Sequence, residues 1–196
     1  MQIELQNIHL PNISIMMLDI PEPALDYLDA VCADIQANPG KYEPWNPNLA
    51  GHLQDQYRFD FNADFKSFIE QVAQEYQRHH DRDQPMTLET CWANFQRRNE
   101  YNPSHTHDGI LSFVIWLQIP YDLHEELQVY GDARGKRASC FEFKFTSILG
   151  TICTHTLPVD KTWRGRMCMF PAALVHQVNP FTTSDGVRIS VSGNLI

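Results

Sequence analysis

From Met86 to the C-terminus, short apolar runs alternate with turn residues, and this pattern constrains the fold more than any other feature. The runs are rich in β-branched and aromatic residues, as is typical of strands, and glycine and proline punctuate them. No further helix is predicted in this half, so we expect a β-barrel or jelly roll. The predicted strands cover residues 87–97, 110–119, 138–147, 149–156, 165–170, 173–177 and 187–195.

The first 85 residues have a different character. Residues 1–20 alternate loosely and predict two short strands, broken at Pro11. Apolar residues recur at helical spacing from Pro21 until Pro39 and Gly40 stop the pattern. A second helix is predicted to start at Asn62, which is a good N-cap residue. The chain has neither repeats nor a low-complexity linker. We therefore expect one domain over 1–196, with N-terminal strands and supporting helices in 1–85 and the jelly-roll core in 86–196.

Charge, cysteines and hydropathy argue against several classes of protein. The net charge of −9 would repel a phosphate backbone, so nucleic acid is not an expected partner. The five cysteines are odd in number and form no CxxC pair, which favours reduced thiols in a cytoplasmic protein. We expect neither a signal peptide nor a transmembrane helix, because the sequence lacks the basic and apolar segments that each requires.

Two histidines, His105 and His107, stand immediately before the strand predicted at 110–119. In an extended backbone, residues i and i+2 point the same way, so the two imidazoles can converge on one metal ion. Asp108 would point away unless the backbone bends there. A chain with nine histidines also produces such pairs by chance, and this alternative stays open for the motif taken alone.

The segment 176–190, far from the histidine pair in the sequence, also carries side chains that could bind a metal ion or an anion. His176 ends an apolar run, and a lone histidine in that place is more often structural than metal-ligating. Arg188 and Ser190 follow twelve residues later on one face of an alternating strand. An arginine among apolar neighbours is costly to bury unless it meets an anion. Its planar fork fits a carboxylate, and Ser190 can donate another hydrogen bond. The alternative is an outward-facing arginine on an edge strand.

The combination resembles the 2-oxoglutarate/Fe(II)-dependent oxygenases, and most closely an oxygenase family of phages and marine bacteria. The resemblance rests on residues 101–107, 111–116, 170–176 and 188–190, and it spans roughly residues 87–195. It implies a mainly β fold with supporting helices, the double-stranded β-helix or jelly roll of cupin-like proteins. Iron would lie at one open end of this fold.

The resemblance also implies roles for particular residues. His105 would be the first iron ligand and His176 the distal one. The commonest family motif is HxD or HxE, and His107 departs from it. Either His107 ligates and gives a three-histidine site, or Asp108 does after a bend in the loop, or water or halide fills the position. The far carboxylate of 2-oxoglutarate would bind Arg188, helped by Ser190. From its place on the strand predicted at 87–97, Asn94 is a candidate lining residue for cosubstrate or substrate, and the alternative is a structural amide at the end of that strand.

The expected activity is therefore hydroxylation of a C–H bond. The protein would bind Fe(II), consume 2-oxoglutarate and O2, and release succinate and CO2. Two other functions remain open: a three-histidine cupin-like metalloprotein that does not use 2-oxoglutarate, and a non-catalytic jelly-roll binding module. The primary substrate, a small molecule or a peptide side chain, is not readable. Loops 41–57 and 120–138 are expected to select it. The oligomeric state is open, with a homodimer as one option.

Overall fold

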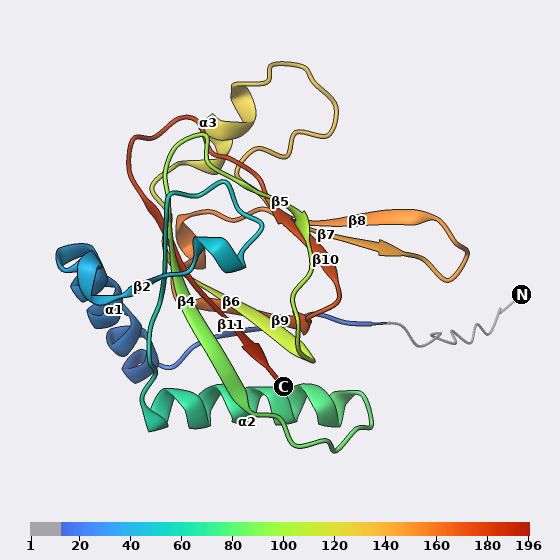
Figure 1. Ribbon diagram of the computed structural model, residues 1–196. Coiled ribbons are helices and arrows are strands. Elements are labelled where there is room, and N and C mark those ends of the chain that lie inside the picture. Colours follow the sequence, from blue (N-terminus) through green and yellow to red (C-terminus); the bar gives the residue numbers. More distant parts are fainter. Residues whose placement is uncertain (1–12) are drawn as a thin grey trace, which may run out of the picture.

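The computed structural model describes residues 13–196 as two antiparallel sheets with helices on the outside (Figure 1). The fold is thus mainly β with supporting helices, as predicted. The larger sheet has the order β1 (Met16–Asp19), β9 (Arg166–Pro171), β6 (Leu111–Gln118), β11 (Arg188–Leu195), β4 (Leu88–Gln96), β3 (Asp55–Arg58) and β2 (Glu43–Pro44). The smaller sheet has the order β5 (Asn102–His105), β10 (Val175–Val178), β7 (Phe141–Thr146) and β8 (Ile152–Leu157).

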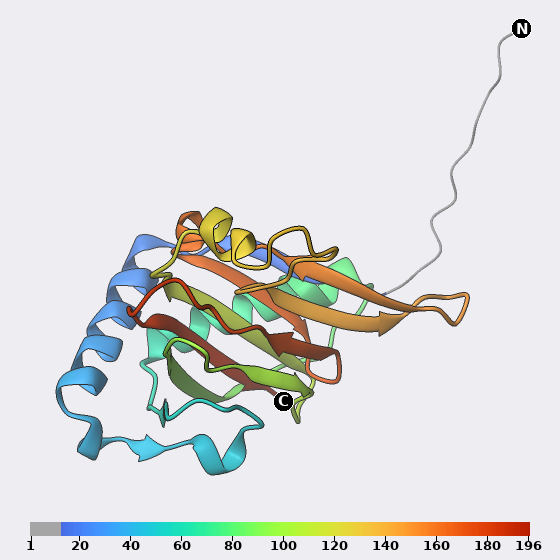
Figure 2. The same ribbon diagram turned by 90° about the horizontal axis from the view of Figure 1, so that it is seen from above.

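Two helices cover the outer face of the larger sheet (Figures 1 and 2). The first, α1 (Glu22–Ala37), carries a proline in its first turn, where the missing N–H costs nothing. The second, α2 (Ala63–His79), starts at the predicted N-cap Asn62, whose side chain accepts a hydrogen bond from the Phe65 N–H at 2.8 Å. Among residues 13–196, no helix is both long and apolar enough to cross a membrane.

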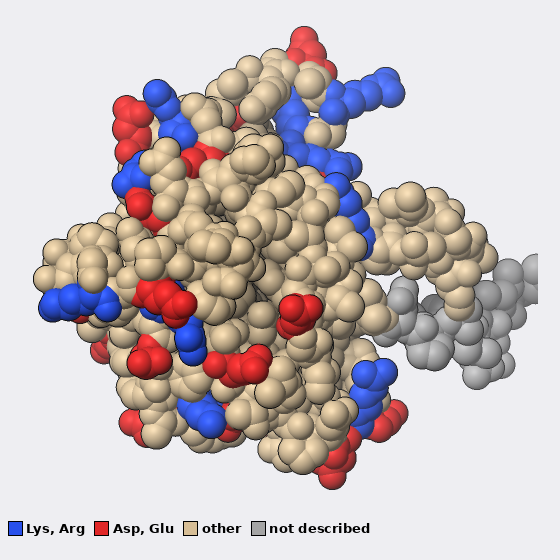
Figure 3. Space-filling model, in the orientation of Figure 1, with Lys and Arg blue, Asp and Glu red and all other residues tan. Residues whose placement is uncertain are grey.

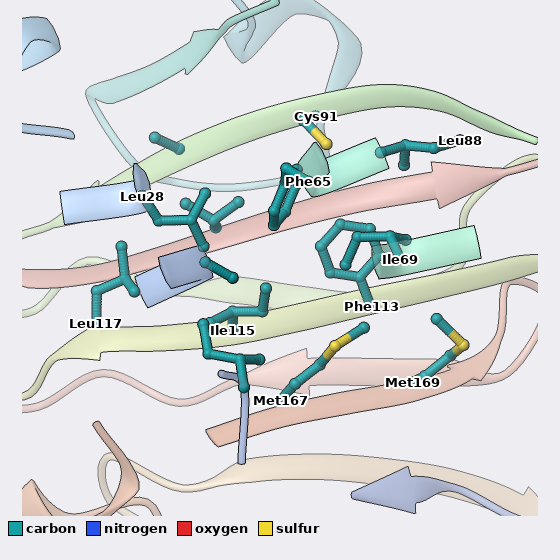
Figure 4. Packing of buried hydrophobic residues seen from close by; sticks show 14 of the residues in the cluster. Leu28, Phe65, Ile69, Leu88, Cys91, Phe113, Ile115, Leu117, Met167 and Met169 are labelled. Atoms are coloured by element: carbon teal, nitrogen blue, oxygen red, sulfur yellow. The ribbon is translucent and has the colours of Figure 1, made fainter. Parts of the chain in front are cut away.

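Strand β6 of the larger sheet carries buried apolar side chains on both of its faces. Phe113 and Ile115 pack toward the helices, and Figure 4 shows Phe65 of α2 lying close to Phe113. The alternate residues Val114 and Trp116 pack toward the smaller sheet. The predicted alternation of β6 is therefore confirmed, and its second face forms one wall of the space between the sheets.

The seven predicted strands of the C-terminal half are all present, but two elements of that half were not predicted. Residues 123–128 form the helix α3 (Leu123–Gln128), so the expectation of no further helix was wrong. This helix is too short to show a helical period. It is held by Glu126, whose buried carboxylate accepts hydrogen bonds from the backbone N–H groups of Thr182 and Thr183. The strand β5 was missed because it has four residues and contains a proline.

The N-terminal half also departs from the expectation in its details. Of the two strands predicted in residues 1–20, the second corresponds to β1, and the first lies outside the described residues. The segment 41–57, predicted as an ordered loop with short extended pieces, contains β2 and part of β3 and so agrees with the prediction. Short 3-10 turns that were not predicted occur at Pro39–Lys41 and Asn46–Asn48, and a third such turn, Lys161–Trp163, lies in the C-terminal half.

Candidate metal and anion site

Three histidine side chains meet in the space between the two sheets. His105 of β5 and His176 of β10 are direct cross-strand partners. His107 follows β5, and its backbone N–H is tied to the carbonyl of Ala172 at 2.9 Å. The three ring centroids lie 4.3 to 5.0 Å apart, and one nitrogen of each ring lies within 4.8 Å of the other two. Asp108 is exposed and does not belong to this cluster.

Hydrogen bonds to the backbone orient two of these rings. The Nδ1 of His105 lies 2.7 Å from the carbonyl oxygen of Pro103, and the Nδ1 of His176 lies 2.9 Å from that of Leu174. A carbonyl can only accept, so each Nδ1 carries the proton and each Nε2 keeps a free lone pair. This is the arrangement in which histidine ligates a metal, with the second nitrogen held by an outer partner.

His176 is buried and His105 and His107 are partly buried, and this burial favours the neutral form of all three imidazoles. Burial, together with the neighbouring His105, lowers the pKa of His176 to about 3. The pKa of His107 falls to about 4 for the same two reasons, and burial also lowers the pKa of His105. Metal ligation requires neutral imidazole, so these rings have no proton to lose when an ion binds at neutral pH.

The lowered pKa values predict that the metal-free protein loses stability in mild acid. Below about pH 6.5 the unfolded chain takes up protons at these imidazoles, whereas His107 in the folded chain stays neutral to about pH 4. The free energy of unfolding should therefore fall as the pH drops from 7 to 5, before the carboxylates titrate. Denaturant titrations of chelator-treated protein measure this. The slope of the unfolding free energy against pH should be smaller in His176→Gln than in the parent. In His155→Gln, a control at an exposed histidine, the slope should be unchanged. Equal slopes in both variants would contradict the prediction.

A buried arginine lies at the other end of the same space. Arg188 is 3% exposed, and its guanidinium has only neutral partners. Nε donates to Gln96 Oε1 at 3.0 Å, and Nη1 donates to the Tyr121 hydroxyl at 2.9 Å and to the Ser139 carbonyl at 2.8 Å. Nη2 donates to Gln96 and to the carbonyl of Asn179. No carboxylate of residues 13–196 forms an ion pair with it, so its charge is buried without a counter-ion.

Polar side chains of β4 and β11 line the wall between the histidines and Arg188. In the register of the two strands, Asn94 lies opposite Ser190. The Asn94 carboxamide faces the hydroxyls of Ser190 at 3.4 Å and Ser192 at 3.3 Å, and it accepts a hydrogen bond from Gln56 at 2.8 Å. The predicted site residues Asn94, Ser190 and Arg188 thus line one cavity together with the three histidines.

Among residues 13–196, no acidic side chain lines the cavity, although the protein has 24 aspartates and glutamates. Its apolar part comes from side chains between the sheets, among them Trp92, Phe141 and Phe170. Three neutral imidazoles at one end and an uncompensated guanidinium at the other favour an anionic ligand, because buried charges in proteins are normally paired. The geometry can therefore hold a cation at the histidines and an anion beside it.

Some lining residues could not be found from sequence. Between the pairs His105–His176 and Asn102–Val178, β5 has two residues where β10 has one, and this bulge places both Asn102 and His105 at the cavity. Residues 49–53 of the predicted substrate loop cover the cavity. Gly51 permits this close approach, because a Cβ there would lie 2.2 Å from Asn102 Oδ1. Tyr121, expected in a substrate loop, instead binds Arg188.

The fold and this cavity define a jelly roll whose histidine cluster could hold a metal ion and whose cavity also contains a buried arginine. A family model described as "Putative 2OG-Fe(II) oxygenase" matches residues 90–194, more than half of the chain. The chain belongs to this family, and it is a 2-oxoglutarate/Fe(II)-dependent oxygenase that uses Fe(II), 2-oxoglutarate and O2. The family assignment argues against both other functions considered above. No curated protein matches the sequence.

Solved structures agree on the double-stranded β-helix. A Pseudomonas putida prolyl-4-hydroxylase superposes with a TM-score of 0.59 at 14% identity, covering 92% of this chain and 91% of that one. A viral collagen prolyl hydroxylase from Paramecium Bursaria Chlorella virus-1, bound to 2-oxoglutarate, gives 0.52 at 12% identity and covers 92% and 94%. The carbocyclase SnoK from nogalamycin biosynthesis gives 0.59 at 13% identity and covers 92% and 78%. At these identities the likeness establishes the fold alone.

The residues in the cavity fit the iron that the family uses. Imidazole is a suitable ligand for iron, and the three rings are neutral and close together. The cluster differs from the usual pair of histidines with one carboxylate, because all three of its members are histidines. An all-histidine set adds no negative charge, so the full charge of a divalent ion would remain for anionic ligands to balance.

Proposed function

We propose that His105, His107 and His176 hold the iron, and that Arg188 receives the far carboxylate of 2-oxoglutarate. One observation carries this proposal: a cavity free of acidic side chains has three neutral imidazoles at one end and a buried, uncompensated arginine at the other. Ser190 and Asn94 would add hydrogen bonds to the cosubstrate along the wall between them. We take His107 as the third ligand in preference to the exposed Asp108.

Bound iron, with 2-oxoglutarate and O2, supplies the oxidation of a substrate C–H bond and releases succinate and CO2. The part played by the chain is to position and to shield. The carbonyls of Pro103 and Leu174 keep the Nε2 atoms of His105 and His176 free to ligate. Phe141 stacks on His176 with ring centroids 5.6 Å apart and keeps water from that side of the site.

For the primary substrate, we propose a small molecule or a peptide side chain. The solved relatives that hydroxylate prolyl residues make a peptide reasonable, and the net charge of −9 disfavours nucleic acid. We also propose that residues 1–196 act as one oxygenase domain, and that it works in the cytoplasm. The second point is supported by five free thiols, of which four are buried; burial raises the pKa of Cys32 to about 12 and keeps this thiol protonated.

Turnover of the cosubstrate tests the proposed activity. Purified protein with Fe(II) should bind 2-oxoglutarate in a calorimetric titration and release succinate in air, faster when a suitable substrate is present. His176→Ala should abolish succinate release, and His155→Ala, at an exposed histidine outside the cluster, should not. Intact protein that neither binds 2-oxoglutarate nor releases succinate with any substrate offered would overturn the proposal.

A further inference from the structure

The hairpin of β7 and β8 projects from the body of the molecule (Figures 1 and 2). Its outer strand, β8, forms one edge of the smaller sheet, and within residues 13–196 it pairs with β7 alone. The other edge strand of this sheet, β5, lies at the metal site. The projecting edge therefore has no place in the cavity already described.

This edge lacks the features that normally protect an exposed strand. No charged residue and no proline occurs from Phe145 to Leu157. The projecting hairpin is accordingly free of blue and red in Figure 3. At its tip, Ile148, Leu149 and Ile152 are 68%, 89% and 80% exposed. Natural edge strands are usually blunted by charge, proline or a covering segment, so an uncharged edge strand beside an exposed aliphatic tip is suited to pairing with another chain.

The ladder between β7 and β8 fixes which backbone groups remain free. The Ser147 N–H donates to the Thr151 carbonyl at 2.8 Å, and Thr146 pairs with Ile152 in the next register position. Antiparallel partners alternate between hydrogen-bonded and non-hydrogen-bonded pairs. Residues 151, 153, 155 and 157 thus bond to β7. The backbone groups of Ile152, Thr154 and Thr156 point away from it.

We propose that this edge pairs with β8 of a second copy of the chain. An antiparallel match through the outward-pointing groups places a two-fold axis at Thr154. Thr154 of one copy then exchanges hydrogen bonds with Thr154 of the other, and Ile152 pairs with Thr156. The two small sheets become one continuous sheet across the dimer, and the exposed aliphatic side chains of each hairpin are brought to the junction.

Charge favours a second copy as the occupant. Two chains that each carry −9 repel one another at long range, and a contact through an uncharged surface adds no further like-charge repulsion at the interface. The segment from Phe145 to Leu157 provides thirteen consecutive uncharged residues. Because its free backbone groups are symmetric about Thr154, the edge is complementary to itself, which is the requirement for a two-fold contact.

Sedimentation measures the proposed contact directly. The full-length chain should sediment as a dimer, and Thr154→Lys should convert it to a monomer by placing two positive charges at the axis. The matched control is Val129→Lys, which adds a lysine at a 56% exposed aliphatic position outside the hairpin and should remain dimeric. A parent chain that stays monomeric at all concentrations up to its solubility limit would overturn the proposal.

A cross-link tests the register without disturbing the fold. Hydrogen-bonded antiparallel partners have Cα atoms about 5.5 Å apart, within the range that a disulfide spans. Cys153→Ser/Thr154→Cys should therefore form a covalent dimer on mild oxidation. In Cys153→Ser/Thr156→Cys the two thiols would be about 13 Å apart along the strands, and no covalent dimer should form. A dimer in which only the second variant cross-links, or neither does, would refute this interface.

Discussion

Replacing His107 with alanine is expected to raise the Kd for Fe(II) by at least about 100-fold, since losing even an outer partner of a metal ligand costs about 10- to 100-fold. His107 lies within 4.8 Å of both other histidines through one nitrogen, and its ring is packed against Trp92. Its lowered pKa keeps it neutral and ready to ligate at pH 7. Anaerobic titration with Fe(II), or with Co(II) followed by its absorption, measures the loss.

Asp108→Ala is the matched control, because it removes the neighbouring carboxylate and leaves the three histidines in place. It should bind Fe(II) as the parent does. His107→Asp, which restores a carboxylate at the usual family position, should recover binding that His107→Ala loses. The opposite pattern, with iron lost in Asp108→Ala and retained in His107→Ala, would show that the loop rearranges and that Asp108 is the ligand.

The strands of the jelly roll could be predicted because their signal is local. In β6 the faces alternate every two residues, so Phe113 and Val114 are assigned to opposite sides by the sequence itself. The helix α3 has no such signal. It is fixed by a long-range contact, from Glu126 to the backbone of Thr182 and Thr183, which no local pattern contains. The turn that Glu126 holds lies shortly before Arg188, so an unpredicted helix supports a predicted site.

The same distinction applies to the candidate site. The histidine pair and the Arg188–Ser190 pair could be proposed because each depends on a spacing of two within one extended segment. The surroundings of Arg188 depend on tertiary contacts instead, because Ser139 and Asn179 contribute backbone carbonyls, which have no residue signature. Asn102 was missed for another reason: the bulge in β5 breaks the period of two that would have placed it.

The second large effect is expected at Arg188, where methionine should raise the Kd for 2-oxoglutarate and leave that for Fe(II) unchanged. Removing one partner of a buried charge pair costs about 2–5 kcal/mol, which is on the order of 30- to 5000-fold in Kd. Arg188 is 3% exposed and has no carboxylate partner in the described chain, so little of the interaction with a bound carboxylate is screened by water. Anaerobic calorimetry on the iron-loaded protein separates the two constants.

Two further variants test whether the effect on 2-oxoglutarate binding is specific to the guanidinium of Arg188. Lysine keeps the charge but not the planar fork that engages Gln96, Tyr121 and Ser139, so it should bind 2-oxoglutarate with intermediate affinity. Arg98→Met, at an exposed arginine, should behave as the parent.

Thermal stability provides a second readout, because a saturating ligand stabilises only a protein that binds it. Arg188→Met should therefore show no shift in Tm at cosubstrate concentrations that stabilise the parent. An undiminished shift would mean that the far carboxylate is held elsewhere in the cavity and that the buried cation serves only to join Gln96 to the loops around it.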